Sequence, residues 1–129
     1  MLDFNDTQTP VPRDLDAERE AIRAELLAQL ESVLAERGQC LPFEPPHFGA
    51  GATVGGMVAA GLSGPSRAAV GAVRDYVLGA TLLNGRGEVL SFGGQVMKNV
   101  AGYDVSRQLA GSMGTLGVIL EVSLKVLPV

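Results

Sequence analysis

Residues 77–92, VLGATLLNGRGEVLSF, contain two apolar segments separated by the tetrapeptide Asn84-Gly85-Arg86-Gly87. An Asn-Gly pair between two apolar runs is a strong signal for a β-hairpin, because both residues tolerate the positive φ angles of the favoured turns. We therefore predict two antiparallel strands, over residues 77–84 and 88–92.

Residues 118–126, VILEVSLKV, predict a further strand with one buried and one mostly hydrated face. The face expected to be buried carries Val118, Leu120, Val122, Leu124 and Val126. The opposite face carries Ile119, Glu121, Ser123 and Lys125. Between the hairpin and this strand, Asp104 is placed to cap a short helix whose Val105 and Leu109 share one side.

The chain upstream of the hairpin changes character at Gly38. Residues 1–37 contain nine acidic residues against four arginines, whereas all 17 glycines follow. Helical spacing of the apolar residues predicts an amphipathic helix from about Asp14 to Arg37, with Gly38 as its C-cap. The apolar residues are Leu15, Ile22, Leu26, Leu30, Val33 and Leu34. We accordingly divide the chain into an acidic lead and helix, residues 1–37, and a glycine-rich domain, residues 38–129.

Composition excludes several classes of function. The formal charge of −4 and the pI of 4.9, without a basic cluster, argue against a nucleic-acid partner. One cysteine, Cys40, and one histidine, His47, provide neither an internal disulfide nor a zinc site, so we expect no metal. The absence of a long apolar run and of a signal-peptide pattern in the sequence leads us to expect a cytoplasmic protein.

Familiar catalytic and nucleotide-binding motifs match poorly. Residues 49–55, GAGATVG, resemble a loose dinucleotide fingerprint, but prolines precede them in place of a strand. Residues 110–114, AGSMG, resemble a nucleophile elbow, but no histidine follows. Asp75 and Asp104 lie beside turn and helix-start signals, so their simplest role is capping of backbone N–H groups.

A pattern of separated glycine turns remains. A proline-rich connector, residues 41–48, is expected to be extended and to lie on the domain. Residues 53–56, TVGG, can open a short helix and present backbone N–H groups to an anion, and residues 114–117, GTLG, precede the last strand in a similar way. Such a chain can bind a large phosphate-bearing cofactor mainly through its backbone.

The sequence also resembles a known family. Its stretches GGMVAAGLSGP (55–65), VRDYVLG (73–79), KNVAGYD (98–104) and GSMGTLG (111–117), with LPFEPPHFG before them, closely resemble the FAD-binding subunits of bacterial glycolate oxidases. These subunits belong to the vanillyl-alcohol-oxidase or PCMH-type flavoproteins. The resemblance runs from about Gly38 to Pro128. It implies an α+β fold, a mainly antiparallel sheet with flanking helices that forms the second subdomain of a PCMH-type FAD-binding domain.

The resemblance also implies a cofactor and residues that contact it. FAD would be the electron carrier in the oxidation of a 2-hydroxy acid, such as glycolate, to the 2-oxo acid. Carried onto this sequence, the family pattern implies four groups of residues: Gly55, Gly56, Ala60 and Gly61 at the diphosphate; Ser63, Gly64, Gly71, Arg74 and Asp75 in the loop beside the cofactor; Gly102, Tyr103 and Asp104 in the turn under it; and Gly114, Thr115, Gly117 and Val118 at the adenosine half. Lys98 and Asn99 would belong to the loop that folds against flavin. Each glycine also has a simpler interpretation as a turn former.

Two hypotheses follow from the comparison with the family pattern. We find no stretch in residues 1–37 that resembles the family's first flavin subdomain, and we expect no counterpart of its cap domain in residues 1–129. In the first hypothesis, this chain is part of a glycolate oxidase-type oxidoreductase, binds FAD when the missing part is supplied by another chain, and works with other subunits of the complex. In the second, it is a cofactor-free scaffold or interaction module that self-associates through the exposed flavin-side face.

Overall fold

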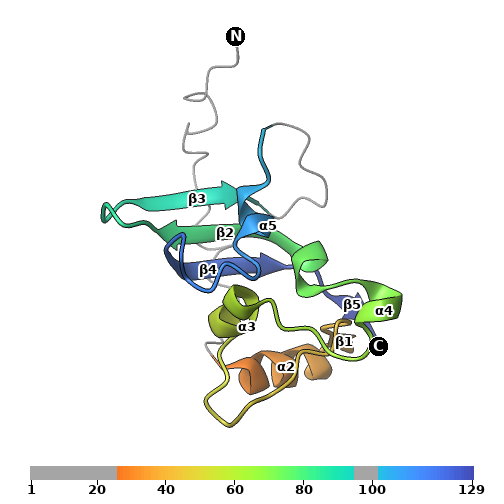
Figure 1. Ribbon diagram of the computed structural model, residues 1–129. Helices are drawn as coiled ribbons and strands as arrows, with labels where there is room; N and C mark the ends of the chain where they lie inside the picture. Colours follow the sequence, from red (N-terminus) through yellow and green to blue (C-terminus); the bar gives the residue numbers. More distant parts are fainter. Residues whose placement is uncertain (1–25, 95–101) are drawn as a thin grey trace.

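The computed structural model describes residues 26–94 and 102–129, and its centre is a three-stranded antiparallel sheet (Figure 1). The strands are β2 (Val77–Leu83), β3 (Val89–Gly93) and β4 (Val118–Leu124), in the order β3-β2-β4. The predicted hairpin is confirmed, with Leu83 opposite Val89. The α+β arrangement expected from the sequence is confirmed as well.

The hairpin turn is closed by the asparagine side chain. Asn84 Oδ1 accepts hydrogen bonds from the backbone N of Arg86 at 2.9 Å and of Glu88 at 3.0 Å. Asn84 Nδ2 donates to a carboxylate oxygen of Glu88 at 2.7 Å. The local sequence therefore fixes the strand register without help from distant segments.

Helix α2 (Leu27–Glu36) ends where the sequence predicts, because Gly38 follows it with φ +64°. The prediction of one helix through Leu26 is wrong, because the Leu26 backbone is extended and forms an antiparallel bridge with Thr53. Residues 14–25 of the predicted helix lie outside the described residues. After Gly38, β1 (Gln39–Cys40) pairs with β5 (Leu127–Pro128), and Val129 N donates to Gly38 O. The start of the glycine-rich part is thus tied to the last residues of the chain.

Four short helices complete the part of the fold that the structure describes. They are α3 (Val54–Ala60), α4 (Arg67–Val70), the 3-10 helix η2 (Val73–Tyr76) and α5 (Val105–Gln108). Figure 1 shows α3 between β4 and α2, and contacts join α3 to both elements. Helix α5 contacts β2 and β3. The helices thus cover the sheet and link it to α2.

The main buried cluster joins segments from the whole described chain. It contains Leu27, Leu34, Leu41, Phe43, Val54, Met57, Val58, Val73, Tyr76 and Val77. Phe43 is fully buried, and its ring centroid lies 5.3 Å from that of Tyr76. The expectation that the proline-rich connector lies on the domain is therefore confirmed, and its aromatic residue anchors it. A smaller cluster of Ala80, Leu82 and Leu109 lies between α5 and the sheet.

The alternation predicted for the last strand is wrong in its first half. The partners Thr81↔Glu121 and Leu82↔Ile119 leave Leu120 as an extra residue, a β-bulge that reverses the faces on either side of it. Ile119 therefore packs against both buried clusters, whereas Val118 is 60% and Leu120 53% exposed. After the bulge, Val122, Leu124 and Val126 pack against the core as predicted.

No helix within residues 26–94 and 102–129 has the length and apolar character needed to cross a bilayer. In the same two ranges, no group of three or more His, Cys, Asp or Glu side chains is arranged to hold a metal ion.

Candidate cofactor site

Helix α3 begins at the segment that the family pattern places against the FAD diphosphate. Thr53 is its N-cap, and Thr53 Oγ1 accepts a hydrogen bond from Gly56 N at 3.0 Å. The Gly56 N–H group that we expected to meet an anion is therefore already bonded within the helix. Gly55 differs, because a Cβ atom built on it would come no closer than 3.9 Å to another segment, at Ile119 O. The internal packing would accept a methyl group at Gly55, so close packing within the fold does not require glycine there.

An open groove of about 270 Å³ lies beside the start of α3. Thr53 and Gly56 line it together with Phe48, Gly51 and Met57. Phe48 is 81% exposed although it is a large apolar residue. The beginning of α3 is thus an accessible surface of the domain.

The C-terminal end of α3 is held by the segment that joins α5 to β4. Gly111 N donates to Val58 O at 3.0 Å, and Met113 N donates to Ala59 O at 2.8 Å. A Cβ atom on Gly61 would lie 3.1 Å from Gly111 Cα, so the two backbones approach closely. The structure therefore brings two of the predicted cofactor segments, 55–61 and 111–117, side by side, as Figure 1 shows.

The second of these segments is tightly folded. Thr115 Oγ1 donates to Ser112 O at 2.7 Å. A Cβ atom on Gly117 would collide with Leu83 O, so this glycine has an internal role at the edge of the sheet. Ser112 Oγ is buried and has no hydrogen-bond partner among the described residues. Gly114 and Thr115 are exposed between these fixed points.

The predicted loop beside the cofactor also makes internal contacts. Ser63 Oγ accepts a hydrogen bond from Val73 N at 3.0 Å. Gly64 N donates to Phe43 O at 2.7 Å, and a Cβ atom on Gly64 would collide with Glu44 O. Only glycine allows the loop and the proline-rich connector to approach so closely.

The turn before β2 is organised by Asp75. Its Oδ2 accepts a hydrogen bond from Ala72 N at 2.9 Å, and a Cβ atom on Gly71 would lie 2.7 Å from the same oxygen. The Arg74 side chain is exposed. The capping role proposed for Asp75 is confirmed, whereas cofactor contacts of Gly71, Arg74 and Asp75 stay a prediction.

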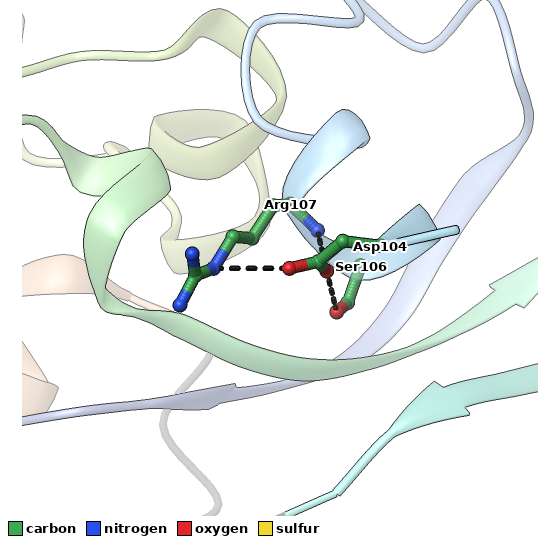
Figure 2. Close-up of polar contacts among 3 residues, drawn as sticks. All are labelled: Asp104, Ser106 and Arg107. Atoms are coloured by element: carbon green, nitrogen blue, oxygen red, sulfur yellow. Dashed lines mark hydrogen bonds and ion pairs between the residues drawn. The ribbon is translucent and has the colours of Figure 1, made fainter. Parts of the chain in front are cut away.

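Asp104 caps α5, as Figure 2 shows. Its Oδ1 accepts hydrogen bonds from Arg107 N at 3.2 Å and from Ser106 Oγ at 3.0 Å, while its Oδ2 lies 3.2 Å from Arg107 Nε. Tyr103, the preceding residue, is 80% exposed. Gly102, Tyr103 and Asp104 thus lie at one end of α5, and the segment that contacts α3 begins at its other end. Lys98 and Asn99 lie outside the described residues.

Two residues near these segments have positive φ angles that sequence reasoning missed. They are Glu44, with φ +46°, and Met113, with φ +55°. Glycine or asparagine in a sequence indicates that such a conformation is accessible, whereas glutamate and methionine do not. Hydrogen bonds to distant segments hold both residues, so a sequence motif could not have found them.

Comparison with known proteins identifies the family. The FAD binding domain family matches residues 13–93, more than half of the chain. The chain belongs to the FAD binding domain family. The match confirms the predicted resemblance and indicates FAD as the cofactor of this family member.

Individual relatives agree with this assignment. The glycolate oxidase subunit GlcE of Escherichia coli (strain K12) is 59% identical over 102 residues, which cover 79% of this chain and 29% of that protein. The mitochondrial D-lactate dehydrogenase [cytochrome] of Arabidopsis thaliana is 38% identical over 97 residues, which cover 75% of this chain and 17% of that protein. A solved structure of alkyldihydroxyacetonephosphate synthase matches with a TM-score of 0.64 at 30% identity, covering 81% of this chain and 18% of that one. The chain thus spans less than a third of the length of these relatives.

The geometry around α3 fits a bound dinucleotide. Gly55 lies in the first turn of α3, whose Thr53 and Gly56 line the open groove, and a Cβ atom on it would make one ordinary contact, 3.9 Å from Ile119 O. The buried Ser112 Oγ, which lacks a partner in residues 26–94 and 102–129, lies in the neighbouring segment. A flavin dinucleotide bound along these two segments would meet mainly backbone, as the sequence pattern predicts.

Proposed function

We propose that this chain forms the FAD-facing part of an oxidoreductase that converts 2-hydroxy acids to 2-oxo acids. The relatives are named for glycolate oxidase and D-lactate dehydrogenase, and both glycolate and D-lactate are 2-hydroxy acids. The observation that carries the proposal is the accessible start of α3, where Thr53 and Gly56 line an open groove, in a chain of the FAD binding domain family. FAD, when bound, would be the electron acceptor when the carbon that bears the hydroxyl group is oxidised.

The chain's own residues would orient and hold this cofactor. We assign the start and end of α3, with Gly55, Gly56, Ala60 and Gly61, to the diphosphate region. We assign Gly114, Thr115, Gly117 and Val118 to the adenosine half, and Gly102, Tyr103 and Asp104 to the turn under the cofactor. Ser63, Gly64, Arg74 and Asp75 would shape the loop next to it. The hydrogen bonds that tie residues 111 and 113 to α3 support a joint role for the two segments.

The carboxylates of Asp75 and Asp104 in these segments have structural roles. Asp75 and Asp104 each accept a backbone N–H bond that caps a helix or turn. We therefore propose for this chain a cofactor-holding role and assign it no proton transfer. We further propose that it acts as one subunit of a larger assembly, because its relative GlcE is named as a subunit of glycolate oxidase.

Titration with FAD tests the proposal. Flavin is excited and emits in the visible, away from protein emission, so the change in flavin fluorescence on binding can be measured directly. We expect saturable binding, and a visible flavin band that glycolate or D-lactate bleaches anaerobically once the remaining subunits are added. Absence of saturable binding, both alone and with those subunits, would contradict the assignment and favour a cofactor-free scaffold.

A further inference from the structure

Glu44 adopts a backbone conformation that glutamate rarely occupies. Its φ angle is +46°, in the left-handed region, where the Cβ atom of an L-residue is crowded. Such a conformation persists only where the surrounding structure holds it, and it is common where a segment positions a ligand. The contacts of Glu44 therefore need an explanation.

The Glu44 carboxylate holds Ser66, a residue 22 positions away in the sequence. Its Oε2 accepts a hydrogen bond from Ser66 Oγ at 2.6 Å and another from Ser66 N at 3.2 Å. Hydrogen bonds to an ionised carboxylate are shorter and stronger than those between neutral groups. Ser66 is the N-cap of α4 and makes no capping bond with its own side chain, and Glu44 from another segment accepts the backbone N–H and the hydroxyl of this N-cap residue.

The same two segments are also joined through their backbones. Gly64 N donates to Phe43 O at 2.7 Å, and the Phe43 side chain is fully buried. On the other side of the loop, Ser63 Oγ accepts from Val73 N at 3.0 Å. The loop of residues 61–66 is therefore fixed at both ends, with Glu44 as the single charged side chain in these bonds.

We propose that Glu44 is a positioning residue, whose carboxylate holds Ser66 and so keeps the loop 61–66 in the shape that faces the cofactor. This inference rests on the proposed function, because residues 61, 63 and 64 belong to the segments assigned to FAD. Glu44 acts through Ser66 and does not itself touch the cofactor. When the hydrogen bonds between Glu44 and Ser66 are lost, only a fraction of the molecules has the loop conformation that binds FAD, and the apparent affinity for FAD falls by that fraction.

The variant Glu44→Gly tests this inference. Glycine accepts φ +46° without strain, so the backbone shape remains accessible while the carboxylate and its two hydrogen bonds are lost. We expect the apparent dissociation constant for FAD to rise on the order of fivefold to tenfold, in a variant that still unfolds cooperatively. Amide hydrogen exchange should accelerate at Gly64 and Ser66 and stay unchanged in β2. Glu44→Gln, which keeps an acceptor oxygen, should restore most of the affinity.

A matched control is Glu88→Gly. The Glu88 carboxylate also accepts a short hydrogen bond, from Asn84 Nδ2 at 2.7 Å, but it lies on the hairpin. This control should leave both FAD affinity and exchange at Gly64 and Ser66 unchanged. If Glu44→Gly exchanges at the wild-type rate at these two amides, the inference is overturned, whatever the flavin result. If exchange at Gly64 and Ser66 accelerates in Glu44→Gly but the wild-type protein does not bind FAD, the role of Glu44 in holding the loop is supported and the proposed function fails.

Discussion

Replacement of Gly55 by alanine should change stability and FAD affinity in opposite directions. Gly55 lies in the first turn of α3, and its new Cβ atom would make only one ordinary contact, at 3.9 Å from Ile119 O. Alanine is favoured over glycine in a helix by about 0.5–1 kcal/mol, mainly because the unfolded chain loses freedom. For a domain of this size, we expect a rise in melting temperature of about 2–4 °C.

The expected loss of FAD affinity follows from the position of Gly55 in the first turn of α3. If the backbone at Gly55 approaches the FAD diphosphate, a methyl group there separates them and removes at least one charged hydrogen bond. Such a bond contributes about 1.5–3 kcal/mol, which corresponds to about a tenfold to hundredfold loss of affinity. The variant would then be more stable and bind FAD more weakly, a combination that simple damage to the fold does not produce.

Differential scanning calorimetry of the free protein and flavin fluorescence titration measure the two quantities. Gly85→Ala is the control, because the Cβ position of Gly85 meets nothing within 4 Å but lies in the hairpin turn. It should leave FAD affinity unchanged. Wild-type affinity in Gly55→Ala would refute the cofactor contact, and a lower melting temperature would show that the packing at Ile119 O does not accept the methyl group. Gly56 is unsuitable for this test, because its Cβ atom would lie 2.8 Å from the capping Thr53 Oγ1.

Substitutions at two further positions test the internal contacts of the site. Gly61→Ala should destabilise the protein by about 1–3 kcal/mol, because φ is +68° and the Cβ atom would lie 3.1 Å from Gly111 Cα; a wild-type urea midpoint would contradict this. Asp104→Ala should lower the free energy of unfolding by about 1 kcal/mol through loss of the α5 cap, whereas Asp104→Asn, which keeps an acceptor oxygen, should lose less. Equal urea midpoints for the two Asp104 variants would indicate that the Arg107 ion pair, and not the cap, is the main contribution.

Local features of the fold could be predicted because neighbouring residues determine them. The Asn84-Gly85 turn, the helix end at Gly38 and the caps at Thr53 and Asp104 each involve contacts within a few residues. Family markers distributed over residues 55–117 likewise identified the flavoprotein family without any knowledge of contacts. The cofactor and the α+β class followed from the sequence for that reason.

The faces of β4 could not be predicted from alternation alone. A regular strand would bury Val118 and Leu120, but the bulge at Leu120 leaves both exposed and turns Ile119 into the core. A bulge arises where the partner strand and the packing above it require an extra residue. The alternating pattern contains no information about that partner.

The sequence by itself determined the family, the hairpin, the helix ends and the caps, since these depend on short-range geometry. Only the tertiary structure decided which glycines close packing requires and which positions would accept a side chain. A Cβ atom on Gly64 would collide with Glu44 and one on Gly117 with Leu83, whereas one on Gly55 would make only an ordinary contact with Ile119 O, although all three glycines look alike in the sequence. The distinction depends on how closely segments far apart in the chain approach one another, and packing of the whole domain fixes those distances.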